Sequence, residues 1–126
     1  MRVLAGLFLI FIVIISVGIW SNHSLKTSTE ELIGNIDEIE QNLQNGQLDA
    51  AQQKFQELEK FWEEKSKWWP VILDHQEMDN IEFSMARTGA FLEKESIHLI
   101  WGELAELRLM IKHIPEKESF NIQNIF

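Results

Sequence analysis

Cysteine is missing from this 126-residue sequence, and so are the short motifs that mark many enzymes. Without cysteine the chain can form no disulfide bond, no thiolate metal site and no lipoprotein-type lipid anchor. It has no glycine-rich phosphate loop, no nucleophile elbow, no HExxH zinc motif and no Ser-His-Asp order. We therefore expect a protein that is not an enzyme and needs no cofactor.

Charge is missing from residues 3–20, which contain only one hydroxyl group. At roughly 1.5 Å of rise per residue, such a helix crosses about 30 Å of hydrocarbon. A secretory signal peptide is the alternative, but its apolar region is typically about 7–15 residues, and the one small-x-small site, at residues 16–18, lies inside the run. We expect an uncleaved transmembrane anchor at residues 1–22 and a single domain at residues 23–126. Trp20 then lies where an interfacial aromatic is expected.

The charges are distributed very unevenly along the chain. All 20 acidic residues and 10 of the 11 basic residues follow the apolar run, and the formal net charge is -9. Such an acidic domain repels nucleic acid and anionic lipid. The short N-terminal side carries Arg2 and the α-amino group, whereas Lys26 on the other side is followed by acidic residues. The positive-inside rule therefore predicts a single-pass protein of the cell membrane with its N-terminus inside and its domain extracytoplasmic.

Apolar residues recur at helical spacing throughout the domain. The stripes predict helices at residues 27–44, 48–68, 70–92 and 97–114. After a linker at His23, the first would begin at capping boxes within residues 27–31 and end at a turn at residues 45–46. Pro115 would stop the fourth helix. We expect the tail to fold back on the core through Ile122, Ile125 and Phe126.

A shift of 49 residues superimposes the apolar stripes of the two halves of the domain. It places Leu32, Ile36, Ile39 and Leu43 on Ile81, Met85, Thr88 and Leu92, and Phe55, Leu58 and Phe61 on Leu104, Leu107 and Met110. The turn Asn45-Gly46 then falls on Lys94-Glu95. We predict an all-α fold in which an N-terminal transmembrane helix precedes a four-helix domain of two antiparallel hairpins. The stripes fit both a tetratricopeptide-like stack and a bundle.

Five ionisable side chains crowd residues 74–82. His75, Asp79 and Glu82 share one helix face because their spacing is four and then three residues. They could hold a divalent cation or form an acid–base pair, with His98 or Glu103 as a further metal ligand.

The simpler interpretation of this segment, which we favour, is a solvated face near a helix N-terminus, where acidic residues are stabilising. Asp74 alone continues an apolar stripe backwards, so its carboxylate could cap a neighbouring helix or pair with Arg87 or Arg108.

Aromatic side chains form the second conspicuous group. They are Phe61, Trp62, Trp68, Trp69 and Trp101. In a small domain such side chains supply much of the buried area, so we expect most of them in the core. Two adjacent tryptophans on a helix cannot both face inward, so one of Trp68 and Trp69 is expected at the surface, where it could bind a partner.

The stretch WWPVILDHQEMDNIE at residues 68–82, together with HIPE at residues 113–116 and NIF at residues 124–126, resembles an uncharacterised bacterial family, domain of unknown function 4363. The resemblance covers nearly the whole chain. Members of this family are small, begin with a hydrophobic helix and occur mainly in spore-forming Gram-positive bacteria. The resemblance implies no catalytic residues. It suggests a partner, because the family's genes often neighbour those of YetF-type multi-span membrane proteins.

We therefore expect a membrane-anchored extracytoplasmic helical interaction module, an accessory subunit of a multi-span membrane protein. The residues expected to touch the partner are Trp68, Trp69, Asp74, His75, Asp79 and Glu82. The alternative is a sensor that binds a cation or small ligand on the face spanning residues 74–82.

Overall fold

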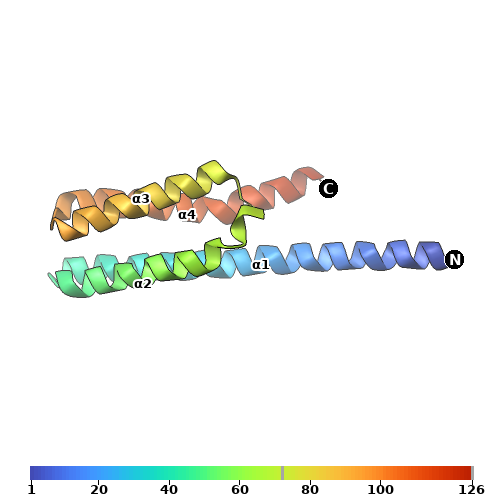
Figure 1. Ribbon diagram of the computed structural model, residues 1–126, viewed down its shortest axis with the longest axis horizontal. Helices are drawn as coiled ribbons and strands as arrows, with labels where there is room; N and C mark the ends of the chain where they lie inside the picture. Colours follow the sequence, from blue (N-terminus) through green and yellow to red (C-terminus); the bar gives the residue numbers. More distant parts are fainter. Residues whose placement is uncertain (72, 126) are drawn as a thin grey trace.

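The computed structural model describes residues 1–71 and 73–125, with side chains described up to residue 116. This part of the chain contains four α-helices, one short 3-10 helix and no strand (Figure 1). They are α1 (Arg2–Gln44), α2 (Leu48–Ser66), η1 (Trp69–Val71), α3 (His75–Glu93) and α4 (Ile97–Ile125). The all-α prediction is confirmed.

α1 is one uninterrupted helix of 43 residues, so the apolar run continues directly into the domain. The expected linker at His23 and the expected helix start within residues 27–31 are both wrong. The Thr27 hydroxyl donates to the His23 carbonyl at 3.0 Å, and the Thr29 hydroxyl donates to the Lys26 carbonyl at 2.8 Å. A hydroxyl that bonds to the preceding turn lies within a helix and does not cap a new one.

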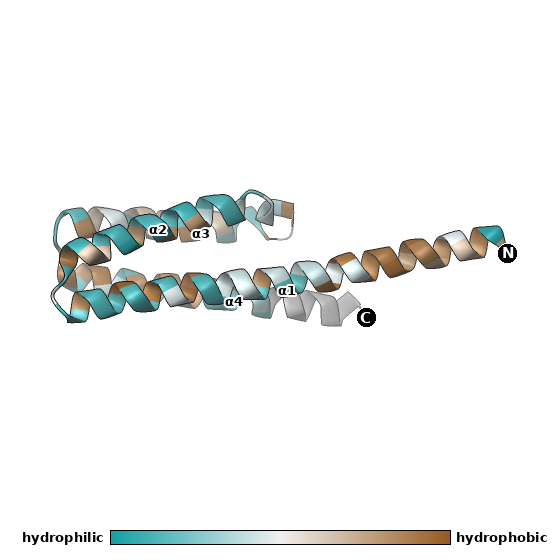
Figure 2. Ribbon diagram, turned by 90° about the horizontal axis from the view of Figure 1, so that it is seen from below, coloured by the Kyte–Doolittle hydropathy of each residue, from teal (hydrophilic) through white to brown (hydrophobic). Residues whose placement is uncertain are grey.

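The N-terminal part of α1 is long and apolar enough to cross a membrane, and none of it is buried in the protein. Figure 2 shows this part as a hydrophobic rod that extends beyond the bundle. From Leu25 onward, α1 enters the core, where Leu25, Leu32, Ile36 and Ile39 are all buried. α1 therefore contains the candidate membrane span and is also one of the four helices of the bundle.

The four helices close into a bundle. α1 packs on α2 and on α4, α3 packs on α4, and α2 meets α3 along a smaller contact (Figures 1 and 2). In a tetratricopeptide-like stack the first and last helices would be separated by the other two. Because α1 packs extensively on α4, the domain is a closed bundle of two antiparallel hairpins and not a stack of repeats.

The two hairpin turns have the same backbone structure. After α1, Gly46 has φ 70°, and its N–H donates to the Leu43 carbonyl while Gln47 N–H donates to the Asn42 carbonyl. After α3, Glu95 has φ 56°, and the N–H groups of Glu95 and Ser96 make the corresponding bonds to Leu92 and Phe91. Both are Schellman motifs with a left-handed residue just past the helix end. The predicted turn at Asn45-Gly46 is confirmed, and its match to Lys94-Glu95 holds residue by residue.

The 49-residue shift also relates the buried residues of one hairpin to those of the other. Leu32, Ile36 and Ile39 are buried, and so are their counterparts Ile81, Met85 and Thr88. The positions Phe55 and Leu58 and their counterparts Leu104 and Leu107 are likewise buried, whereas Phe61 and Met110 are half-buried. Thr88 is accommodated because its hydroxyl donates to the Ser84 carbonyl at 2.8 Å. The two hairpins thus bury equivalent faces.

Two predicted helix boundaries are wrong. The third helix was expected from residue 70 but begins at His75, because residues 69–71 form η1 instead. Pro115 was expected to stop the fourth helix but lies inside α4. A proline removes one backbone hydrogen bond and crowds the preceding turn, and here the helix continues through that loss. The expected contacts of Ile122, Ile125 and Phe126 with the core lie outside the described residues.

Candidate interaction surface

The connection between α2 and α3 lies beside α1, at the end of the bundle from which the apolar run emerges (Figure 1). It contains η1 and both adjacent tryptophans. The two hairpin turns lie at the opposite end (Figure 1). The bundle thus has an apolar-run end, where the η1 connection lies, and a turn end.

Three tryptophan rings meet at the apolar-run end of the bundle. Trp69 makes an edge-to-face contact with Trp62, with ring centroids 5.2 Å apart, and a second one with Trp68 at 6.2 Å. Such T-shaped pairs are favoured by the quadrupoles of the rings. Trp69 is 0 % exposed, and its indole N–H meets no acceptor within the described part of the chain. Trp69 is therefore a core residue, and the prediction that it touches a partner is wrong for this structure.

Trp68 lies differently from its neighbour. It is half-buried, and its ring lies 6.5 Å from that of Trp20 at the end of the apolar run. The two residues are far apart in the sequence, so no local pattern pointed to this contact. Trp101 does not join the group, because it lies near the start of α4 at the turn end (Figure 1).

Asp74 caps the helix that follows it. Its backbone is extended, with φ -64° and ψ 137°, and its carboxylate accepts from the Gln76 N–H at 3.4 Å. An aspartate at this position satisfies a backbone donor that the helix itself leaves unpaired. Neither capping of another helix nor pairing with Arg87 or Arg108 is needed to explain it.

His75, Asp79 and Glu82 are all exposed, in the N-terminal half of α3. His75 and Asp79 are one turn apart, and Phe83 continues the same line one turn further while 60 % exposed. Glu82 lies nearer to α2 and accepts a hydrogen bond from the Trp62 indole at 3.4 Å. Two exposed residues of the predicted site, His75 and Asp79, thus form a ridge together with Phe83, which was not among the predicted residues. We call this line of three residues the α3 ridge.

The described residues contain no group of three or more histidine and carboxylate side chains that could hold a metal ion. Glu103, one expected further ligand, instead accepts from Ser84 Oγ at 3.1 Å and from Arg87 Nε at 2.9 Å. His98, the other, lies on α4 near the turn end and is exposed. Within the described residues, the structure therefore does not bring His75, Asp79 and Glu82 together as a metal site.

Ion pairs join the helices across the bundle surface. Arg108 on α4 bridges Asp37 at 2.6 Å and Glu40 at 2.7 Å on α1. Partial burial lowers the pKa of Arg108, but the hydrogen bonds to Glu40 and Asp37 outweigh it and raise the pKa overall. On α3, hydrogen bonding to Glu103 of α4 raises the pKa of Arg87. These arginines hold α4 to its two neighbours.

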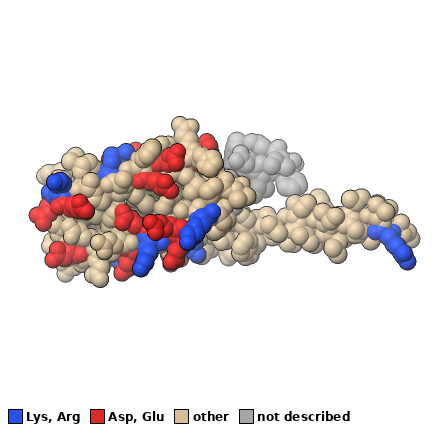
Figure 3. Space-filling model, viewed as in Figure 1, with Lys and Arg blue, Asp and Glu red and all other residues tan. Residues whose placement is uncertain are grey.

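Charged side chains are confined almost entirely to the bundle. Figure 3 shows acidic and basic side chains interspersed over the bundle and, along the apolar rod, only a basic side chain at its end.

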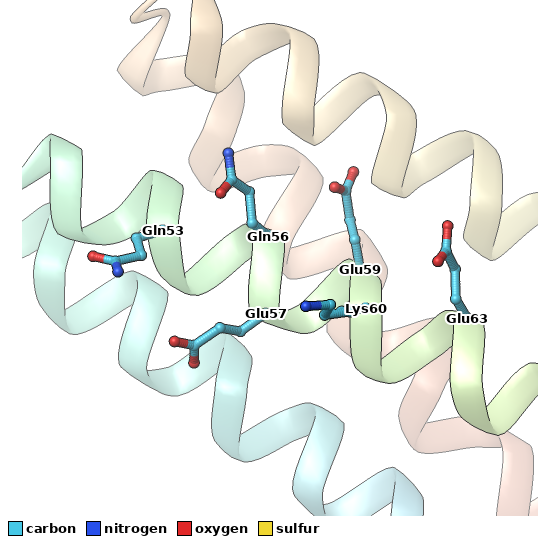
Figure 4. Close-up of a pocket in the computed structure, with 6 residues that line it drawn as sticks. All are labelled: Gln53, Gln56, Glu57, Glu59, Lys60 and Glu63. Carbon is cyan, nitrogen blue, oxygen red and sulfur yellow. The ribbon is translucent and has the colours of Figure 1, made fainter.

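The outer face of α2 is rich in carboxylates. Figure 4 shows a shallow hollow lined by Gln53, Gln56, Glu57, Glu59, Lys60 and Glu63. All six belong to α2, so the hollow is a solvated helix face. The pKa of Glu59 is raised, mainly because the carboxyl is partly buried and secondly because Glu63 and Glu93 repel its charge.

Comparison with models of known protein families identifies a family for this chain. A family model described as "Domain of unknown function (DUF4363)" matches residues 19–125. The matched region begins at the end of the apolar run and includes the whole bundle. No curated protein and no solved structure matches the chain.

Proposed function

The chain belongs to the DUF4363 family, and from that premise we propose that it is a membrane-anchored extracytoplasmic interaction module, an accessory subunit of a multi-span membrane protein. The observation that carries the proposal is the continuity of α1. A helix that leaves the bilayer and enters the core without a linker holds the bundle at the membrane surface. Anchoring raises the effective concentration of the bundle beside another membrane protein, so a modest surface contact is enough to bind.

The buried faces of the helices support binding by the surface. The four helices bury their stripes against one another, and the hollow of Figure 4 is an open helix face. The α3 ridge offers an imidazole, a carboxylate and an exposed phenyl ring in one line. An exposed aromatic surrounded by polar groups is typical of protein contact sites. A YetF-type protein, which the sequence resemblance suggests, would meet this ridge through the part of its fold outside the bilayer.

The test is a pull-down of tagged full-length protein from detergent-solubilised native membranes. We expect recovery of one multi-span protein in constant ratio, and a several-fold lower recovery with the double variant Asp79→Ala, Phe83→Ala. Asp49→Ala at the turn end is the matched control, since Asp49 is also an exposed helical carboxylate. Trp69 is unsuitable for this test because its truncation would disturb the core.

Recovery of the tagged protein alone would overturn the proposal. Equal recovery with the α3-ridge variant and the control would retain the accessory role but move the contact elsewhere on the bundle.

A further inference from the structure

The geometry points to a second contact of the bundle, with the bilayer itself: residues 68–71 lie in the lipid headgroup region beside the anchor. This inference rests on the anchoring part of the proposed function. It adds that the bundle stands directly on the membrane, with the Trp68–Val71 connection as its contact surface.

The first step is the depth of Trp20. This residue ends the uncharged run and is 67 % exposed on α1. Tryptophan at the end of a span prefers the boundary between hydrocarbon and water, where its ring is apolar and its N–H can reach a polar group. The depth of Trp20 therefore fixes the level of the headgroups along α1.

The second step is the contact between Trp20 and Trp68. Their ring centroids lie 6.5 Å apart with an interplanar angle of 30°, so Trp68 must lie at nearly the same depth. Because α1 has no break between Trp20 and the core at Leu25, the bundle cannot lift this connection away from the surface.

The third step is the exposure of the residues that follow Trp68. Trp69 is buried, whereas Pro70 and Val71, which follow it, are exposed, and Val71 is 89 % exposed. A valine this exposed at the end of a small bundle gains little in water, whereas insertion at the bilayer boundary would bury its apolar surface.

The local charge agrees with a lipid surface even though the domain is acidic. Residues 65–73 carry Lys65 and Lys67 and no acidic residue. Lysines that flank an apolar contact can extend their ammonium groups to lipid phosphates while their stems lie along the apolar surface. Within this acidic domain, residues 65–73 are therefore a stretch without acidic residues, bounded by Glu64 and Asp74.

The absence of cysteine makes the test direct. Full-length protein is labelled with an environment-sensitive fluorophore at Val71→Cys and reconstituted into phosphatidylcholine vesicles. Matched proteins carry the label at Asp49→Cys at the turn end, and at Ile10→Cys within the anchor. Iodide in the buffer and a spin label on the lipid headgroup serve as the two quenchers. Because Val71 is so exposed, the label leaves the core intact, and unchanged helical circular dichroism and melting check this.

We expect the label at position 71 to be quenched by the headgroup spin label and to be several-fold less accessible to iodide than the label at position 49. If position 71 is as accessible to iodide as position 49 while position 10 remains protected, the surface contact is overturned and the anchor stands. If position 10 is also accessible to iodide, both the anchor and this inference are overturned.

Discussion

At the scale of single residues, Glu95 holds a backbone conformation that suits glycine far better. Its φ of 56° is the counterpart of 70° at Gly46 in the other hairpin turn. A left-handed conformation costs a residue with a Cβ about 1–2 kcal/mol, which the greater freedom of glycine in the unfolded chain partly offsets.

Glu95→Gly should therefore raise the free energy of unfolding by about 0.5–1 kcal/mol. Gly46→Ala should lower it by roughly 1 kcal/mol, because a Cβ would be strained at that positive φ. Chemical denaturation of both variants beside the parent protein measures the two effects. A loss of stability in Glu95→Gly would mean that the two turns do not share one backbone structure.

Glu59 is a second residue in an unfavourable environment, because its surroundings disfavour the ionised carboxylate. Partial burial and the carboxylates of Glu63 and Glu93 raise its pKa above the ordinary value of 4.5. The folded state then binds this proton more tightly than the unfolded state does, so the contribution of Glu59 to stability falls as pH rises through the raised pKa.

Glu59→Gln should stabilise the protein at pH 7 by roughly 0.2–0.5 kcal/mol, the size of one repulsive pair spaced by four residues on a helix. The gain should disappear well below pH 4.5, where the carboxyl is protonated in both states. Thermal melts at the two pH values measure it, with Glu64→Gln on the same helix as the control. An equal gain at both pH values would show that charge is not its cause.

At the scale of elements, the packing of α1 on α4 is what closes the bundle. Arg108 contributes to it by bridging Asp37 and Glu40 while only 27 % of its side chain is exposed. A partly sheltered arginine with two carboxylates is worth more than an isolated surface pair.

Arg108→Met should therefore cost about 1 kcal/mol of stability, and the loss should be smaller at high salt. Lys112→Met, one turn further along α4 and exposed, is the matched control and should change stability little. Denaturant melts at low and high ionic strength make the comparison. A similar loss from both variants would assign the effect to α4 generally and not to the ion pair.

Prediction from sequence worked for elements that local chemistry defines. The apolar stripes predicted α2 and the buried faces of both hairpins, and Asn45-Gly46 predicted the turn between α1 and α2. Both predictions held because apolar spacing and the conformation of glycine act over a few residues. The predicted start within residues 27–31 failed because Ser28 and Thr29 are buried against the bundle, so packing overrode a capping signal. Likewise, the contact of Trp20 with Trp68 and the burial of Trp69 depend on tertiary structure alone.

In the whole molecule, one continuous helix connects the candidate membrane span to the bundle. The anchored module and the bilayer contact both depend on it, because a flexible joint near His23 would let the bundle move freely above the surface. The backbone at residues 21–28 distinguishes the two cases, since helical amides exchange slowly and linker amides exchange fast.

The most direct measurement is hydrogen–deuterium exchange of the full-length protein in phosphatidylcholine nanodiscs. We predict that amides at residues 21–28 are protected about as strongly as those of α1 within the bundle, while the first-turn amides of α2 at residues 48–50, for which a helix supplies no partner, exchange quickly. Fast exchange at residues 21–28, equal to that at residues 48–50, would contradict the continuous helix and with it the fixed position of the bundle on the membrane.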